Sequence, residues 1–255
     1  MRSLRILAAS IRDFGVLATL DELPAYLLSP LTTRRRRRLK EEQLSRDGFD
    51  EAHGTDTAGV LDGRELGTGV TKGGNLASRY ETTSAAAIKT ALDSVGIDFS
   101  GFTFVDLGCG KGKPLMIAAS YAFRRLIGLD SSAACIRIAR RNIGDYGPDG
   151  IDPSRIELLT MDVEEFEFPG DPLVIYLFNP FPAKLMERVI AKLERSLRDE
   201  PREAAIVYVN PQVVAALAHS ALFVRIPTIA DRMPMVADGL LRYEAAAVFV
   251  TRPAA

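Results

Sequence analysis

The segment Phe104–Gly112 constrains the fold of this chain more than any other. The apolar run Phe104–Leu107 includes Asp106 and is followed by glycines at positions 108, 110 and 112. Such a run ending in alternating glycines is typical of a buried strand that turns tightly into a helix. Glycine lets the backbone approach a ligand that a Cβ atom would push away. The sequence therefore predicts a strand, a turn and a helix, with a ligand at the turn.

A dinucleotide-binding fingerprint fits this segment less well. The pattern G-x-G-x-x-G requires a third glycine at position 113, where the chain has Lys113. The dinucleotide-binding pattern also has no acid at the position of Asp106, two residues before Gly108. A nicotinamide cofactor is therefore the weaker interpretation.

Length and composition indicate one α/β domain with an accessory amino-terminal segment. The chain has 255 residues, of which 47% are hydrophobic, and this is enough for a full core. We expect residues 1–77 to form a helical cap and a glycine-rich lid, and residues 78–255 to form the main domain. Within the first part, the spacing predicts an amphipathic helix near the start. The glycines of residues 47–75 predict a long mobile loop without continuous helix or strand.

Charge argues against nucleic acid and membrane as partners. A formal net charge of −1 gives no general attraction to phosphate backbones. The run Arg34–Arg38 is a local exception, which we interpret as a solvated helix face. Charged residues interrupt the apolar start, so no stretch approaches the ~20 residues of a membrane span.

The cysteines and histidines indicate neither a disulfide framework nor a metal site. Cys109 and Cys135 are the only cysteines, which fits a reducing cytoplasm, and we expect both to be buried. His53 and His219 lie far apart in the sequence without a further metal ligand beside them. For His53 the sequence is compatible with a lid contact or with a solvated loop position.

From residue 84 onward, helical and apolar segments alternate, which is typical of a mostly parallel sheet with crossover helices. We expect seven strands with helices on both faces. The expected strands are Thr103–Leu107, Leu126–Leu129, Ile156–Leu159, Leu173–Phe178, Ala205–Val209, Phe223–Ile226 and Ala246–Val250. The expected helices are Ser84–Val95 with Ser84 as N-cap, about Pro114–Tyr121, Ala133–Ile143 and Ala183–Leu197.

The first two strand ends supply candidate ligand contacts, because ligands of parallel sheets bind outside the carboxyl ends of the strands. Gly108 and Gly110 would leave room for the ligand, and Asp106 would accept from an ammonium group, directly or through water. Asp130 lies 24 residues beyond Asp106, near the ~20-residue separation at which an acid reaches ribose hydroxyls. The alternative is that Asp130 caps the next helix, in competition with the two serines that follow it.

The third strand end offers contacts for a purine ring. Asp162 would accept from the exocyclic amine of adenine, and the backbone amide of Val163 would donate to the ring. Glu164 or Glu165 would replace Asp162 if the register of this loop shifts.

The fourth strand runs into Asn179-Pro180-Phe181-Pro182. The Asn179 carboxamide can accept from an amino group, and Phe181 can form a wall for a substrate. The alternative is an ordinary turn, because Asn-Pro commonly opens one.

Over residues 78–251 the chain resembles the class I S-adenosylmethionine-dependent methyltransferases, which share a Rossmann-like seven-stranded sheet. Within that class, Tyr80–Ser84, Phe104–Gly112 and Asn179-Pro180-Phe181 are similar to segments of the non-SET histone-lysine methyltransferases. The chain departs from that family in the position of Glu81, one place early, and has no basic nucleosome-binding tail.

The resemblance implies S-adenosylmethionine as cofactor and assigns roles to further residues. Tyr80, Thr82 and Thr83 would enclose the methionine end of the cofactor, and Asn179 and Phe181 would line a channel for an amine. The Asn-Pro-Phe turn is also similar to the Asn-Pro-Pro-aromatic motif of enzymes that methylate planar amino groups, with the aromatic residue one place early. Both similarities favour nitrogen as the methyl acceptor.

We therefore expect a cytoplasmic methyltransferase that acts on an amine of a small molecule or of a protein side chain. Asn179, Phe181 and Tyr80 are the expected catalytic residues. A neutral amine needs no general base, whereas an oxygen acceptor would use Tyr80, Glu81 or His53. The alternatives are a regulatory protein that binds the cofactor without turnover, and a nucleic-acid methyltransferase that uses Arg34–Arg38.

Overall fold

The structure is a computed structural model that describes residues 47–59, 80–146, 151–178, 180–211, 213–218, 220–227 and 246–252. The chain divides into two units, residues 1–46 and residues 47–255, and all described residues belong to the second unit. The expected amino-terminal helix, Arg34–Arg38, Asn179 and His219 lie outside the described residues. The expected domain boundary between residues 77 and 78 stays a prediction.

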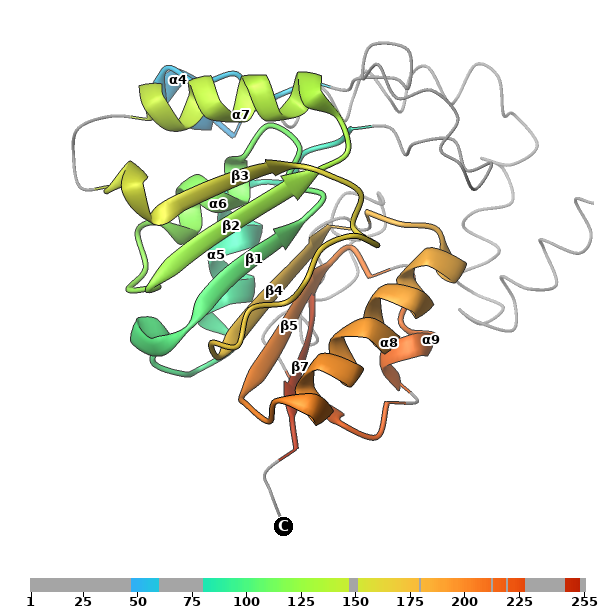
Figure 1. Ribbon diagram of the computed structural model, residues 1–255. Coiled ribbons are helices and arrows are strands. Elements are labelled where there is room, and N and C mark those ends of the chain that lie inside the picture. The colour runs from blue at the N-terminus through green and yellow to red at the C-terminus, as the bar shows by residue number, and fades with distance from the viewer. Residues whose placement is uncertain are drawn as a thin grey trace, which may run out of the picture. The chain divides into compact units, whose positions relative to one another are not determined.

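The described residues form a seven-stranded sheet in the order β3-β2-β1-β4-β5-β7-β6 (Figure 1). Neighbouring strands run parallel except at β7, which is antiparallel to both β5 and β6. The expected α/β fold with a mostly parallel sheet is confirmed. The strands are β1 Thr103–Leu107, β2 Arg125–Asp130, β3 Ile156–Thr160, β4 Leu173–Phe178, β5 Ala204–Val209, β6 Phe223–Ile226 and β7 Ala246–Thr251.

Helices cover both faces of this sheet. Figure 1 shows α8 and α9 on one face and α5 and α6 on the opposite face. The expected N-cap of α5 is confirmed, because the Ser84 hydroxyl accepts from the Ala87 amide at 3.1 Å. At the start of α7 the Ser132 hydroxyl accepts from the Cys135 amide at 3.3 Å. The helices are α4 Phe49–His53, α5 Ala85–Asp93, α6 Lys113–Ala118, α7 Ala133–Asp145, α8 Ala183–Asp199 and α9 Ala215–Ala218, with short 3-10 turns at Phe99–Gly101 and Pro153–Arg155.

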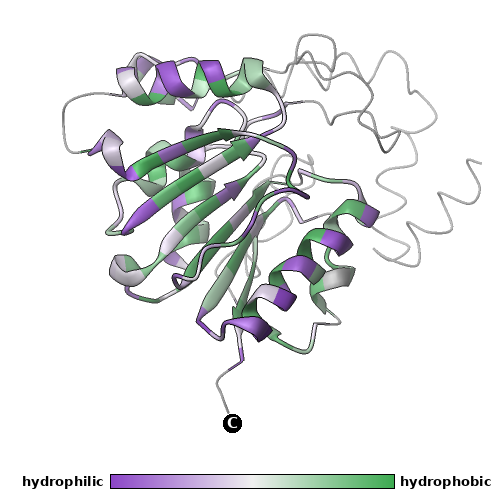
Figure 2. Cartoon of the chain, viewed as in Figure 1, coloured by the Kyte–Doolittle hydropathy of each residue, from purple (hydrophilic) through white to green (hydrophobic). Residues whose placement is uncertain are grey.

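Alternate residues of the central strands pack into two separate cores. On β1, Phe104 faces the α5 and α6 side, while Val105 and Leu107 face the α8 side. Figure 2 shows apolar residues along these strands and a mixture of apolar and hydrophilic residues along α8. Burial on both faces explains why β1, β4 and β5 read as continuous apolar runs in the sequence.

The expectation of a continuous loop over residues 47–75 is wrong in its first part. The helix α4 forms at Phe49–His53, and the Phe49 side chain is buried in the α5 and α6 core. Gly48 and Gly54 flank this helix in left-handed conformations, so they bound it rather than prevent it. We call residues 47–59 the strap.

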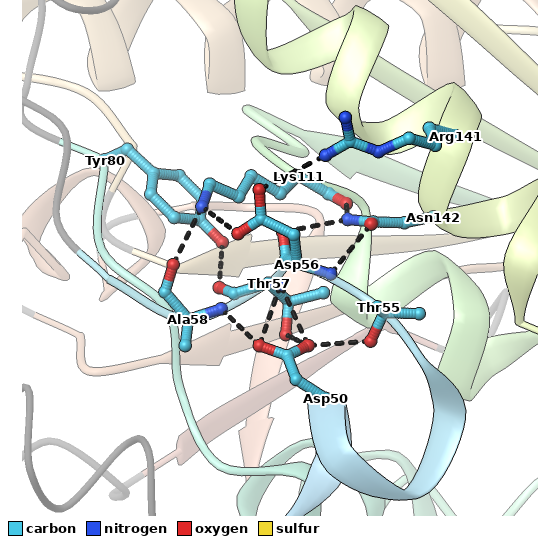
Figure 3. Close-up of polar contacts among 9 residues, drawn as sticks. All are labelled: Asp50, Thr55, Asp56, Thr57, Ala58, Tyr80, Lys111, Arg141 and Asn142. Carbon is cyan, nitrogen blue, oxygen red and sulfur yellow. Dashed lines mark hydrogen bonds and ion pairs between the residues drawn. The ribbon is translucent and has the colours of Figure 1, made fainter.

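The Asp50 carboxylate organises the strap internally (Figure 3). It accepts hydrogen bonds from the hydroxyls of Thr55 and Thr57 at 2.7 Å each, and from the amides of Thr57 and Ala58 at 2.7–2.9 Å. Burial raises the pKa of Asp50, but these hydrogen bonds lower it by more, so the pKa lies below its ordinary value of 3.8.

The strap is also bonded to the turn that follows β1, as Figure 3 shows. The Lys111 ammonium donates to the Asp56 carboxylate and to the Ala58 carbonyl, at 2.8 Å each. The Asn142 side chain, from α7, donates to the carbonyls of Asp56 and Lys111 at 3.0 and 2.9 Å and accepts from the Asp56 amide at 2.9 Å. These bonds fix the strap against the glycine turn.

One glycine in β2 permits close packing beneath that turn. A methyl group added at Gly128 would lie 2.4 Å from Leu115 Cδ1 and 3.1 Å from the Cys109 side chain, and both neighbours are buried. We expect Gly128→Ala to lower the free energy of unfolding by about 1–3 kcal/mol, because the core must shift to admit the methyl group. Urea denaturation measures this.

The matched control is Gly144→Ala in α7. Nothing lies within 4 Å of the added methyl group there, and alanine favours helix over glycine. We expect this variant to be at least as stable as the natural chain. A Gly128→Ala variant with undiminished stability would contradict the packing described around β2.

Charge on Asp50 should control the order of the strap. A carboxyl group whose pKa is lowered by folding stabilises the folded state at pH values above its ordinary pKa of about 4. This stabilisation is lost as the pH falls through the lower pKa of the folded protein. We expect Asp50→Asn to speed hydrogen exchange of the Thr57 and Ala58 amides several-fold at neutral pH. The difference from the natural chain should shrink once acid protonates its own carboxyl group.

Asp98→Asn is the control for this experiment. Asp98 also has a lowered pKa, through hydrogen bonds from Ser100, but it caps the 3-10 turn Phe99–Gly101. Exchange in the strap should not change in this variant. If Asp50→Asn left Thr57 and Ala58 as protected as before, the Asp50 hydrogen bonds would not be what orders the strap.

Candidate active site

The turn after β1 lies against the ends of its two neighbouring strands. The amides of Gly108 and Cys109 both donate to the Leu129 carbonyl of β2 at 2.9 Å. On the other side, a Cβ atom at Gly108 would lie 2.9 Å from Pro180 Cβ, in the turn after β4. The expected meeting of strand ends is therefore present.

Gly110 makes room for a side chain of the protein itself. A Cβ atom there would lie 2.3 Å from Tyr80 Cε2, and the backbone has a φ of 51°, which side chains rarely adopt. Pro180 and Tyr80 lie where a Cβ atom of Gly108 or Gly110 would be, so both glycines bring these two side chains to the turn. The expected contact of the two glycines with a ligand stays a prediction.

Tyr80 is held in this position by the strap. Its hydroxyl donates to the Thr57 carbonyl at 2.7 Å, and the Lys111 ammonium lies 5.4 Å from its ring centroid. Burial raises the pKa of Tyr80 well above its ordinary value of 10.0. The hydroxyl therefore stays protonated at neutral pH and serves as a hydrogen-bond donor.

Asp130 closes the turn from the end of β2. Its Oδ2 atom accepts from the Gly110 amide at 3.0 Å, and its Oδ1 atom accepts from the Ser132 amide at 2.7 Å. Burial raises the pKa of Asp130 although these two amides lower it in part. Because Ser132 is the N-cap of α7, Asp130 is not needed as the cap. Each carboxylate oxygen retains a second lone pair for a ligand hydroxyl.

Asp106 is a buried acid whose Oδ2 atom lacks a hydrogen-bond partner among the described residues. Its side chain is 2% exposed. Burial raises the pKa of Asp106 well above its ordinary value of 3.8, and the nearby Asp130 charge raises it further. A buried acceptor without a partner is rare in a folded protein and calls for a donor. The ammonium group of an amino-acid ligand fits this requirement.

The loop after β3 has a defined register. Asp162 is exposed, and its Oδ1 atom accepts from the Glu164 amide at 2.9 Å, while the Val163 side chain is buried. The Glu164 carboxylate binds Arg188 of α8 at 2.6 and 3.0 Å. Glu164 is therefore engaged away from this loop, and Asp162 remains the candidate contact for a purine.

The remaining expected site residues differ in their surroundings. Thr82 and Thr83 are buried, and they lie in the sequence between Tyr80 and the start of α5. Phe181 is partly buried and packs against the core on the α8 side. The roles expected for these residues, and for Asn179 outside the described residues, stay predictions. His53 is exposed, and its ring lies 4.5 Å from that of Tyr146 and 4.8 Å from that of Phe49.

Sequence reasoning did not assign several polar residues that shape this region. Lys111 and Lys113 are buried in the glycine turn and at the start of α6, where they pair with Asp56 and Asp47 of the strap. Two lysines inside an otherwise apolar turn were the available signal, because a buried lysine requires an acidic partner. Nothing in the sequence identifies Asp47 and Asp56 as these partners.

Within the ranges that the structure describes, no three His, Cys, Asp or Glu side chains converge as a metal site would require. Cys109 and Cys135 are buried free thiols. No helix of the described part of the chain has the length and apolar character needed to cross a membrane.

The region around the turn is similar to a known protein family. Residues 104–200 match a family model described as a methyltransferase domain. No curated protein sequence matches the chain.

Solved structures with similarity to the chain include several from bacteria. An S-adenosylmethionine dependent methyltransferase from Mesorhizobium loti is 19% identical, with a TM-score of 0.45 over 65% of this chain and 98% of that protein. An RNA methyltransferase from Salinibacter ruber, in complex with S-adenosyl-L-homocysteine, is 14% identical, with a TM-score of 0.43 over 67% and 92%. The YcgJ protein from Bacillus subtilis is 15% identical, with a TM-score of 0.39 over 49% of this chain and 50% of its own length.

The family match covers β1 to β4, the glycine turn and the acids Asp106, Asp130 and Asp162. The sheet around it has the seven-stranded, mostly parallel arrangement described above. Residues 104–200 are therefore similar to a methyltransferase domain.

Proposed function

We propose that the protein transfers a methyl group from S-adenosylmethionine to an amine nitrogen of a small molecule or of a protein side chain. When bound, the cofactor supplies a methyl group that its sulfonium already activates. The observation that carries the proposal is the buried Asp106 Oδ2 atom beside the glycine turn, which lacks a hydrogen-bond partner among the described residues. An ammonium group at that point supplies the missing donor and a compensating charge.

The other strand ends support binding of the adenosine part. Asp130 can accept from ribose hydroxyls with the lone pairs that the Gly110 and Ser132 amides leave. Asp162 is exposed at the next strand end and can accept from an adenine amine. These three acids come from successive parallel strands, so one extended ligand can contact all of them.

The surroundings of the candidate bases favour a neutral amine as acceptor. Tyr80 is protonated and donates to the Thr57 carbonyl, and the His53 ring packs against Phe49 and Tyr146. In the proposed reaction the nitrogen lone pair forms the bond to the methyl carbon as the carbon–sulfur bond breaks. The proton then leaves the new ammonium for water, so orientation supplies much of the catalysis. Asn179 and Phe181 are the residues proposed to orient the amine.

The function is tested by incubating the purified protein with cofactor labelled in its methyl group and with a cell lysate. Label that survives nuclease treatment supports the proposal, whether it is in protein, from which protease releases it, or in small amines. Label in nucleic acid would indicate the alternative that uses Arg34–Arg38. Calorimetric binding of cofactor without any transfer would indicate a regulatory protein.

Asp130 should contribute strongly to cofactor affinity. We expect Asp130→Ala to weaken binding of S-adenosylhomocysteine by about 1–3 kcal/mol, because buried hydroxyls lose their acceptor. Isothermal titration calorimetry measures the affinity, and thermal denaturation checks that the variant is folded.

Asp152→Ala is the matched control. Asp152 also accepts two hydrogen bonds, from the amide and hydroxyl of Ser154, but it precedes β3 at the opposite end of the strand. Its removal should leave the affinity unchanged. Equal affinity of a folded Asp130→Ala variant and the natural chain would remove Asp130 from the cofactor site.

A further inference from the structure

Tyr176 and Asp106 form a pair of buried polar groups on neighbouring strands. They are register partners in the parallel pairing of β1 with β4. Side chains at paired positions project to the same face of a sheet, here the face covered by α5 and α6. Phe104, which is two residues from Asp106, contacts the Tyr176 ring on that face with a centroid distance of 6.0 Å.

Neither group of this pair is satisfied. Tyr176 is 0% exposed and Asp106 is 2% exposed. Over the part of the chain that the structure describes, Tyr176 Oη and Asp106 Oδ2 are the only fully buried side-chain polar atoms without a hydrogen-bond partner. Two such atoms at one register position indicate a common cause, because native proteins satisfy most of their buried polar groups.

The chemistry of the two groups is complementary. A phenol hydroxyl can donate and accept, whereas a carboxylate only accepts. The two groups do not bond to each other, yet the Asp106 charge is close enough to raise the pKa of Tyr176 further, beyond the larger effect of burial. One water between them would accept from the phenol and donate to the carboxylate. One ammonium would donate to both oxygens through two separate N–H bonds.

We propose that Tyr176 is a positioning residue of the cofactor site, and that its hydroxyl and the Asp106 carboxylate share one bridging group when the cofactor's ammonium is bound. The bridging group is either a buried water or the ammonium itself. With a water as the bridge, Tyr176 acts through Asp106 by fixing the orientation of the carboxylate. With the ammonium as the bridge, the Tyr176 hydroxyl also accepts from the ligand directly. This inference rests on the proposed function, because it requires the ammonium at Asp106.

The test compares two ligands that differ in the amino-acid part. S-adenosylhomocysteine carries the ammonium, and 5′-methylthioadenosine lacks it. We expect Tyr176→Phe, which removes only the hydroxyl, to weaken binding of S-adenosylhomocysteine about tenfold, the effect of about one hydrogen bond. Binding of 5′-methylthioadenosine should be the same in both proteins. A structural role alone would affect both ligands alike.

A double-mutant cycle tests whether Tyr176 acts through Asp106. In an Asp106→Asn background, the further change Tyr176→Phe should leave the affinity for S-adenosylhomocysteine almost unchanged. The same tenfold loss in that background would overturn the inference.

Tyr208→Phe is the matched control. Tyr208 is equally buried, but it belongs to the core on the α8 side of the sheet. Its hydroxyl accepts from the Val213 amide at 3.2 Å. Affinity for both ligands should be unchanged in this variant.

A crystal structure with S-adenosylhomocysteine gives a readout that does not depend on the variants. One atom within hydrogen-bond distance of both Tyr176 Oη and Asp106 Oδ2 supports the inference, and its identity separates water from ammonium. Separate partners for the two groups would overturn it. If the natural chain bound neither ligand, the proposed function would fail and the inference with it. Tight binding of both ligands without an effect of Tyr176→Phe would overturn the inference alone.

Discussion

Close approach of the backbone at the turn after β1 is the constraint on which the candidate site depends. Where Gly108 and Gly110 lack a Cβ atom, Pro180 and Tyr80 occupy the space. Pro180 follows β4, whereas Tyr80 precedes α5 and is bonded to the Thr57 carbonyl of the strap. One turn thus sets the positions of three segments that are far apart in the sequence. A side chain added at either glycine would therefore collide with Pro180 or Tyr80 and disturb packing within the protein, whether or not a ligand is bound.

The fold could be predicted because the central strands β1, β4 and β5 are buried on both faces. The expected bounds of β1, β4 and β6 match the observed ones, and the remaining strands differ only at their ends. Arg125 and Asp130 belong to β2 although they interrupt the apolar pattern, since backbone pairing continues through them. The acids at the strand ends could be predicted for the same reason, because parallel pairing brings successive carboxyl ends to one edge.

The parts that could not be predicted depend on long-range pairing of polar groups. Glycine density in the strap suggested a loop, but a buried Phe49 and the hydrogen bonds of Asp50 stabilise local structure there. The ion pair of Lys111 with Asp56 joins residues 55 positions apart, and no periodicity in the sequence records it. Tyr176 reads as one more core residue in an apolar run, and only the register with β1 places it beside Asp106.

In the proposed site, the acids at the turn couple ligand binding to stability. Folding buries Asp106 and raises its pKa, so the unfolded chain releases this proton at lower pH than the folded protein does. The stability of the protein without ligand therefore falls as the pH rises from the ordinary pKa of the carboxyl toward its raised pKa in the folded protein. A cation bound at Asp106 reverses this, because it favours the ionised carboxylate and lowers its pKa again. Asp106 and Asp130 thus disfavour the folded protein at neutral pH, but they favour a ligand that carries positive charge. This coupling is a physical reason to keep the two acids in a core that apolar side chains would otherwise stabilise better.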